Sequence, residues 1–238
     1  MFPLRDNIPT ENFPWVTVAL IVANAIVYFF LQDGRLGLPH DGLGGDWPTP
    51  TYAAIPCEIT GSSPCDTVPG GPSPWVTLFT SMFMHGSIVH IGGNMLFLWI
   101  FGNNVEDSMG RVTFLVFYLL GGLAADALQI LTSPGSEVPS LGASGAVAAV
   151  LGGYLVLFPR ARVVTLIFIV FFFTILELPA ILFLGIWIIQ QAVFAYFDLL
   201  QPSGGGGGVA YFAHIGGFAF GLLLIRVFAR RSRQVQPT

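Results

Sequence analysis

The sequence predicts an all-α, polytopic membrane protein: a bundle of six transmembrane helices with a long first extracytoplasmic loop. The mean hydropathy of the 238 residues is +0.75. Hydrophobic residues make up 54% of the chain and charged residues only 9%, whereas a soluble domain carries roughly a quarter charged residues. Apolar runs recur along the chain, several near the roughly 20 residues that a helix needs to cross a hydrocarbon core. Lipid is therefore the predicted solvent for most of this protein.

The six predicted spans belong to a single domain that covers residues 1–238. They are Trp15 to Leu31, Ile88 to Gly102, Val112 to Leu131, Ser144 to Phe158, Ala180 to Phe197 and Val209 to Phe228. The second and fourth are short, and at 1.5 Å rise per residue they reach only about 22 Å. Each of these two helices must therefore begin below one membrane surface. The Gly204 to Gly208 run before the last span is predicted to be a flexible linker.

Charge predicts the orientation and excludes one class of partner. The net charge of −4 offers no basic surface for nucleic acid, so partners are expected in or beside the bilayer. Short cytoplasmic loops carry the excess of positive charge. The arginines on one side of the six-span arrangement are Arg111, Arg160, Arg162, Arg226, Arg230, Arg231 and Arg233. That side is predicted to be cytoplasmic and to hold both termini.

The long segment from Gln32 to Pro74 falls on the opposite, extracytoplasmic side. It contains the two cysteines of the chain, Cys57 and Cys65. In an oxidising compartment this pair could close a small loop as a disulfide, and two free thiols are the alternative. The spacing between them fits neither a zinc ribbon nor a thioredoxin-like redox site.

Two polar residues stand near the starts of the fourth and sixth spans. Ser144 lies in Gly142-Ala143-Ser144-Gly145, where it could be a simple helix N-cap. His214 lies just inside the sixth span, where it could simply bond to a carbonyl group. Small residues on both spans, including Gly217 and Gly221, allow the two backbones to approach closely. Ser144 could then be a nucleophile activated by His214 as general base.

Two apolar segments lie between the fourth and sixth spans, and the proposed pairing of Ser144 with His214 indicates which of them crosses the membrane. Ser144 and His214 reach the same depth only if an odd number of crossings separates their two spans. Ala180 to Phe197 is therefore predicted to cross, and the apolar segment Val163 to Leu178 is predicted to lie at the interface or to re-enter from the side of Arg160.

A third polar group lies on the second span, in His85-x4-His90-x3-Asn94. His90 and Asn94 share one helix face, because they are four residues apart. Donors aimed at one point suit an oxyanion hole. A metal site from His85, His90 and His214, with Asp126 of the third span, is the alternative. It is disfavoured, because no H-E-x-x-H motif supplies the general base of a zinc protease.

Together these motifs resemble the rhomboid intramembrane serine proteases of the bacterial type. The resemblance covers roughly Trp75 to Gly221 and depends on the order of the motifs on the second, fourth and sixth spans. It implies Ser144 as nucleophile, His214 as base and no third acidic member. It also implies His90, Asn94 and the Ser144 backbone N–H as oxyanion donors, with His85 supporting them.

The resemblance further implies no cofactor, no metal, and transmembrane protein segments as substrates. It implies a bacterial inner membrane as location, with an active site that opens to the extracytoplasmic side. One departure concerns the fourth residue after the serine, which is often an aromatic that packs on the histidine but is Ala148 here. Tyr211 is a candidate substitute, and Asp126 a less favoured candidate for orienting His214.

Two other classes of protein compete with the protease. A non-catalytic rhomboid-like scaffold would bind membrane clients without cutting them, but such proteins usually lack the serine or the histidine. A channel or transporter would predict paired broken spans in two related halves, and the sequence has no such symmetry.

Overall fold

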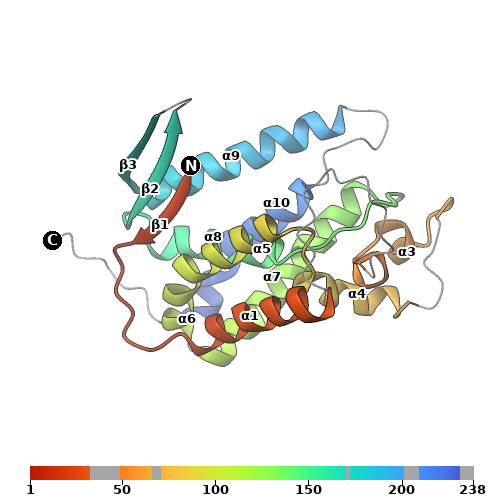
Figure 1. The fold of residues 1–238 in the computed structure, drawn as a ribbon, viewed down its shortest axis with the longest axis horizontal. Coiled ribbons are helices and arrows are strands. Elements are labelled where there is room, and N and C mark those ends of the chain that lie inside the picture. Colours follow the sequence, from red (N-terminus) through yellow and green to blue (C-terminus); the bar gives the residue numbers. More distant parts are fainter. Residues whose placement is uncertain (33–48, 66–70, 170–171, 201–208, 231–238) are drawn as a thin grey trace.

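The structure is a computed structural model that describes residues 1–32, 49–65, 71–169, 172–200 and 209–230. The predicted linker Gly204 to Gly208 lies outside these described residues, as do Arg231, Arg233 and part of the long loop. A bundle of helices forms most of the molecule, and a small sheet stands at one end of it (Figure 1).

The helices of the bundle are α1 (Trp15–Ile26) with the π-helical η1 (Val27–Leu31), α5 (Ile88–Phe97) with the π-helical η3 (Leu98–Gly102), α6 (Asn103–Met109), α7 (Arg111–Thr132), α8 (Ser144–Leu157), α9 (Ala180–Leu199) and α10 (Tyr211–Phe228). Short helices precede α5, namely α2 (Thr49–Tyr52), α3 (Pro56–Thr60), α4 (Pro74–Thr80) and the 3-10 turn η2 (Ser81–Phe83).

Three helices within the described residues are long and apolar enough to cross a membrane: α7, α9 and α10. A fourth candidate is the bent pair Pro74–Phe83 and Ile88–Met109, whose two parts meet at 80°. The apolar helices Trp15–Leu31 and Ser144–Leu157 are shorter than this test requires. The chain is thus an integral membrane protein with three to four clear candidate spans, and the count of six stays a prediction.

Helix α8 lies at the centre of the bundle. Every residue from Gly145 to Tyr154 is buried, which leaves this helix almost no surface for lipid. It packs on α10 through glycines, because a Cβ on Gly217 would lie 2.0 Å from the carbonyl oxygen of Gly145 and one on Gly221 would lie 1.9 Å from that of Ala149. The backbones of α8 and α10 therefore touch directly, as small residues permit.

The helix that contains the second predicted span is longer than expected. The prediction ended it at Gly102, but the chain continues through the π-helical turn η3 into α6 and stops only at Met109. Gly110, with φ 84°, then ends it. The extension has a structural use, since the Glu106 carboxylate accepts bonds from the backbone N–H groups of Val16 and Thr17 at 3.0 and 2.8 Å. It thereby caps the start of α1, where free N–H groups favour negative charge.

The all-α prediction is wrong for two segments. The sheet consists of β1 (Phe2–Asp6), β2 (Arg162–Ile169) and β3 (Phe172–Pro179), in the order β1-β2-β3 with antiparallel pairing throughout. The segment predicted as interfacial or re-entrant is therefore a β-hairpin, β2 and β3, with β1 added to one edge. Its residues are mostly Val, Ile, Leu, Phe and Thr, many of them β-branched or aromatic, which pack well on a pleated surface.

Candidate active site

One large cavity, of about 1310 Å³, is lined by four of the five candidate site residues that the sequence indicated. Ser144, His214, His90 and Asn94 all line it, and so does Trp187 of α9. These residues come from four different helices, which the chain brings to one place. His85, the fifth predicted site residue, lies behind this group.

Ser144 is the first residue of α8, and its position is set by the preceding glycine. The N-cap of α8 is Ala143, and no side chain caps this helix end, so the serine is not used as a cap. Gly142 adopts φ 126°, a conformation that L residues rarely adopt. A Cβ on Gly142 would also lie 2.8 Å from the Nε2 atom of His90. Only glycine lets the chain turn into α8 while His90 approaches Ser144.

His90 and Asn94 lie on α5, whose start is capped by Ser87. The Ser87 hydroxyl accepts a 3.1 Å bond from the backbone N–H of His90. Asn94 is buried, and its Nδ2 group has no hydrogen-bond partner in the structure. An unpaired buried donor costs free energy, on the order of 1 to 3 kcal/mol. Asn94 also lines the cavity, and a buried donor without a partner at this place fits a group that awaits an oxygen atom.

His85 is fully buried and holds the loop before α8. Its Nε2 atom accepts a long 3.5 Å bond from the backbone N–H of Ala143, and its ring packs edge-on against that of His90 at 5.1 Å. The side chain of Gln32 fixes the backbone of His85, since it bonds both the N–H group at 3.0 Å and the carbonyl at 3.1 Å. This position fits a supporting role.

His214 has partners on α9 that the sequence did not suggest. Its Nδ1 atom lies 2.8 Å from Oε1 of Gln191, and its ring packs against Trp187 with centroids 5.8 Å apart. Because Oε1 can only accept, Nδ1 carries the proton, which leaves Nε2 with a free lone pair. The signal available from sequence was a glutamine within an apolar span, because a polar side chain there is costly and commonly has a structural or functional role.

These contacts correct one expectation about the histidine and agree with disfavouring Asp126 as its partner. The aromatic that packs on His214 is Trp187, whereas Tyr211 packs on Phe194 instead. Asp126 is buried on α7, but the partner of the His214 ring is Gln191, and the Oδ2 atom of Asp126 has no partner. The place of a third, orienting member is therefore taken by an amide.

Ser144 and His214 share the cavity but are not hydrogen-bonded to each other in this structure. Their helices are nonetheless in direct contact beside these two residues, where Gly217 meets Gly145, the residue that follows Ser144. Nucleophile and base are often further apart before substrate binds than during the reaction.

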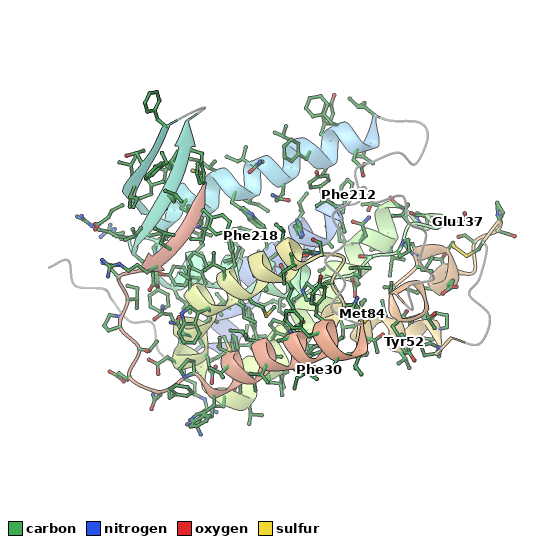
Figure 2. All side chains as sticks on the ribbon, viewed as in Figure 1. Phe30, Tyr52, Met84, Glu137, Phe212 and Phe218 are labelled. Atoms are coloured by element: carbon green, nitrogen blue, oxygen red, sulfur yellow. A yellow bond between two sulfur atoms is a disulfide. The ribbon has the colours of Figure 1, made fainter. Side chains whose placement is uncertain are left out.

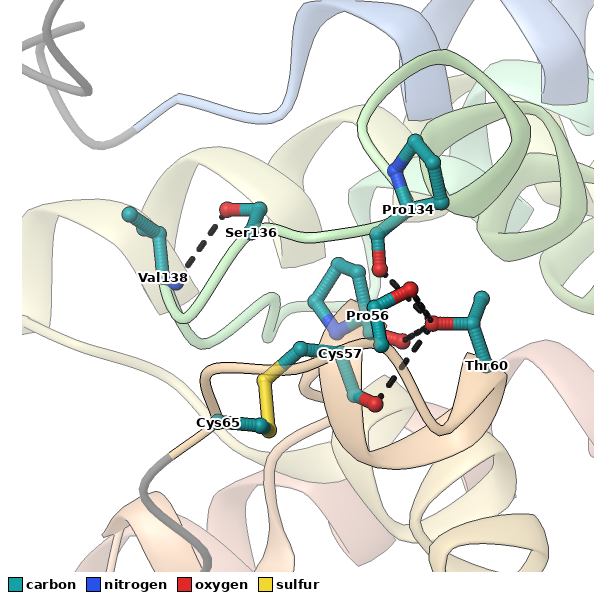
Figure 3. The surroundings of a disulfide bond; sticks show 8 residues. Pro56, Cys57, Thr60, Cys65, Pro134, Ser136 and Val138 are labelled. Atoms are coloured by element: carbon teal, nitrogen blue, oxygen red, sulfur yellow. Dashed lines mark hydrogen bonds between the residues drawn. A yellow bond between two sulfur atoms is a disulfide. The ribbon is translucent and has the colours of Figure 1, made fainter.

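The loop that leads into Ser144 is fastened by the cysteine-bearing segment (Figure 3). A disulfide joins Cys57 to Cys65. The backbone N–H of Cys57 donates to the carbonyl of Ser136 at 3.0 Å, and the Thr60 hydroxyl donates to that of Pro134 at 2.7 Å. Further along the same loop, Ala54 and Ser140 exchange two backbone bonds. This segment therefore forms one wall of the mouth of the cavity.

Among the residues that the structure describes, no group of three His, Cys, Asp or Glu side chains could hold a metal ion. His85, His90 and His214 do not converge on a common point with Asp126 as the metal alternative required.

Comparison with known proteins gives the family. A model of the rhomboid domain matches residues 72–231, which is more than half of the chain. The chain belongs to the rhomboid family. The matched range contains all five predicted site residues and also Gln191, whereas the disulfide, α1 and β1 lie before it. The family that was first inferred from three motifs is thereby confirmed, whereas the bacterial type is not supported by this match.

Several curated rhomboid-family proteins are similar to this chain. RHOMBOID-like protein 12, mitochondrial, of Arabidopsis thaliana is 34% identical over 159 residues, covering 60% of this chain and 43% of that protein. Rhomboid protein 1, mitochondrial, of Saccharomyces cerevisiae is 31% identical over 152 residues, covering 62% and 40%. The mouse presenilin-associated rhomboid-like protein, mitochondrial, is 29% identical over 130 residues, covering 54% and 33%. This rhomboid thus spans less than half the length of these relatives, and all three are named as mitochondrial.

Proposed function

We propose that this rhomboid is an intramembrane serine endopeptidase that cleaves the transmembrane segments of other membrane proteins. The observation that carries the proposal is the convergence of a serine, a histidine with one free ring nitrogen, and an unpartnered amide donor on one cavity. Acyl transfer needs a nucleophile, a base and an oxyanion site within reach of one carbonyl group. Membership of the rhomboid family supports the same reaction.

In the proposed reaction Ser144 Oγ attacks the carbonyl carbon of the scissile bond. Nε2 of His214 takes the hydroxyl proton, because Nδ1 is already engaged by Gln191. The oxygen that becomes negative accepts bonds from Asn94, His90 and the Ser144 N–H. The imidazolium then gives its proton to the leaving amine as the C–N bond breaks, and water hydrolyses the acyl-enzyme by the same steps.

Substrate access imposes a condition on the segment that is cut. The peptide bonds of a helix are shielded by their own hydrogen bonds, so a transmembrane substrate must unwind locally before it enters the cavity. We therefore infer a preference for small residues at the cut and for helix-breaking residues nearby. Lipid is the surrounding solvent, and the reaction uses no cofactor.

The orientation of the protein in its membrane is part of the proposal. The arginines favour cytoplasmic termini and a cavity that opens to the other side, and a disulfide beside the cavity mouth fits an oxidising compartment. A bacterial inner membrane was the expectation from sequence, whereas the similar curated proteins are mitochondrial. Fractionation of the source cells, followed by protease protection of the cysteine-bearing segment, would decide between these membranes.

The test of the activity uses purified protein in liposomes with a panel of labelled transmembrane peptides. We expect cleavage by the wild type and its loss, by more than about 10³-fold, in Ser144→Ala and in His214→Ala. A fluorophosphonate probe should label the wild type at Ser144 and leave Ser144→Ala unlabelled. Cleavage by both variants at the wild-type rate would refute the protease, and absence of probe labelling in a folded wild-type protein would favour the non-catalytic scaffold.

A further inference from the structure

The hairpin formed by β2 and β3 has a large exposed apolar surface. Phe168, Phe172 and Phe173 expose 66%, 78% and 71% of their surfaces. Ile175 and Leu176 are exposed as well. At the other end of the hairpin Val163 and Thr165 are completely buried against the bundle. The half of the hairpin that is far from its base therefore projects from the protein (Figures 1 and 2).

Cross-strand pairing gathers these side chains on both faces of the hairpin. Phe168 is paired with Phe173, and Leu166 with Ile175, so these four residues share one face. Phe172 and Leu176 alternate onto the opposite face of β3. A sheet that faced water would be polar on one side, and this half of the hairpin is apolar on both.

The charges of the hairpin lie at its base. Arg162 pairs with Glu177 at 3.5 Å across the two strands, and the Arg162 backbone N–H is bonded by the side chain of Asn7. Arg5 of β1 lies opposite Val164, near the same end. A charged base and an apolar far end are the arrangement of a segment that meets headgroups and acyl chains together.

The depth of the hairpin follows from the helix that it enters. Pro179 is the last residue of β3 and Ala180 the first of α9, a candidate span of 20 residues. At 1.5 Å per residue that helix is about as long as the hydrocarbon core is thick. Its first residue, and hence the hairpin base, lies near one membrane boundary. Ile181 and Leu182, in the first turn of α9, are exposed as well.

The backbone sets a limit to how deep the hairpin can go. β3 pairs with β2 only, so its outer edge has unpaired N–H and C=O groups. Such an edge is not tolerated in the hydrocarbon core, but water and headgroups can satisfy it at the interface. The strands also run across the long axis of the bundle rather than along it (Figure 1). This direction keeps the hairpin near the membrane boundary instead of deep in the core.

We propose that the β2–β3 hairpin lies in the headgroup and acyl boundary of the leaflet at the arginine-rich end of the bundle, with phospholipid as its partner. The hairpin would hold the first turn of α9 at the membrane surface. Because α9 carries Gln191 and Trp187, both in contact with His214, this lipid contact would fix the helix that orients the proposed base. The lipid contact itself does not depend on whether the protein is a protease.

The test is nitroxide accessibility in liposomes of phosphatidylcholine with phosphatidylglycerol. A spin label is attached to Phe173→Cys, and in separate proteins to Phe172→Cys, Leu182→Cys and Glu137→Cys, with the Cys57–Cys65 disulfide left intact. Leu182 on α9 is the lipid-facing control. Glu137, at the opposite end of the molecule (Figure 2), is the aqueous control. Using both Phe172 and Phe173 keeps the test valid if one substitution prevents folding.

At both hairpin positions we expect the spin label to collide more often with oxygen than with a water-soluble nickel chelate, as at Leu182. At Glu137 we expect the reverse. Greater access for the nickel chelate at Phe172 and Phe173 would overturn the proposal, because the hairpin would then lie in water. Low access for both reagents would also overturn it. Spectral broadening that disappears on dilution with unlabelled protein would identify a second copy, paired along β3, as the true partner.

Discussion

Nδ1 of His214 lies 2.8 Å from Oε1 of Gln191, a residue of the helix that flanks the cavity. The amide oxygen accepts the only proton of a neutral imidazole, so the bond fixes both the ring orientation and the tautomer. This is the task of the acidic member in a serine-histidine-aspartate triad. Here a neutral group performs it, which leaves the positive charge of the imidazolium less stabilised.

Replacing Gln191 therefore tests an orienting role. Gln191→Leu should lower kcat by roughly 10- to 100-fold, as found for groups that orient metal-binding histidines, with a smaller change in KM. Gln191→Glu should move the acidic limb of the pH dependence of kcat/KM upward by about one pH unit or more, because a carboxylate stabilises the imidazolium. Gln190→Leu, at the exposed neighbouring position, is the matched control. An unmoved pH profile in Gln191→Glu would show that Gln191 only packs.

Asn94 is the residue whose loss should affect the transition state alone. Its buried Nδ2 group has no partner, so removing it leaves no other protein group unpaired. Asn94→Ala should lower kcat by about 10²- to 10³-fold, the usual result for one oxyanion donor, with KM nearly unchanged and thermal stability equal to or above that of the wild type. Steady-state kinetics with a transmembrane peptide measure this. A variant with full kcat would remove Asn94 from the oxyanion site.

The contact between α8 and α10 predicts a sharp difference between glycines. A Cβ on Gly221 would lie 1.9 Å from the backbone oxygen of Ala149, whereas one on Gly185 of α9 would meet nothing within 4 Å. Gly221→Ala should lower the free energy of unfolding by about 3 kcal/mol or more. Gly185→Ala should be neutral or stabilising by up to about 1 kcal/mol. Thermal unfolding in detergent micelles compares the two variants. Equal melting temperatures for Gly221→Ala and Gly185→Ala would contradict the tight packing of α8 on α10.

The sequence offered candidate site residues that line one cavity in the structure, but it did not predict all the elements that hold them. Ser144, His90, Asn94 and His214 could be named because polar residues stand out in apolar spans and because their motifs occur in a family order. Their convergence on one cavity also follows from small residues such as Gly217, which the sequence displays. Gln191 could not be assigned, because no spacing rule relates a residue of α9 to the ring of His214. Only the packing of α9 against α10 does so.

The hairpin shows why an apolar run is ambiguous. The residues from Val163 to Leu178 are long and apolar enough to resemble a membrane segment, and periodicity does not distinguish a buried strand from a buried helix. The high content of β-branched and aromatic residues was the remaining signal. The pairing of β1 with β2 was beyond sequence reasoning, because more than 150 residues separate the two strands.

The Cys57–Cys65 disulfide should matter for the cavity mouth more than for the bundle. Closing a loop of this length stabilises by about 2 to 3 kcal/mol in the chain-entropy account, and the segment is bonded to the loop before Ser144. Cys57→Ser with Cys65→Ser should raise KM several-fold while the main unfolding transition of the helices shifts little. Steady-state kinetics give KM, and circular dichroism gives the unfolding transition, in oxidised and reduced samples. An unchanged KM in wild-type protein whose two thiols are proven to be reduced would contradict the prediction.

Asp6 gives the protein a stability that depends on pH. Its Oδ2 atom accepts bonds from the Tyr154 hydroxyl at 2.5 Å and from Nδ2 of Asn104 at 2.7 Å, which ties β1 to α8 and to α6. Burial raises the pKa of Asp6 from 3.8 to about 6, and the bond from Tyr154 offsets only part of that rise. The protonated carboxyl is thus the form that the folded state prefers.

The sign of the effect follows from this raised pKa. Between pH 4 and pH 6 the folded state binds more protons at Asp6 than the unfolded state, so the free energy of unfolding falls as pH rises through this window. The loss should be about 1 to 3 kcal/mol and complete above about pH 6. Asp6→Asn, which resembles the protonated form, should lack it. Melting temperatures of both proteins at pH 4 and pH 7.5 measure the difference, with Glu137→Gln as control for an exposed carboxylate. A gap between the wild type and Asp6→Asn that stays constant with pH would contradict this prediction, because it would mean that Asp6 has the same pKa in the folded and the unfolded state.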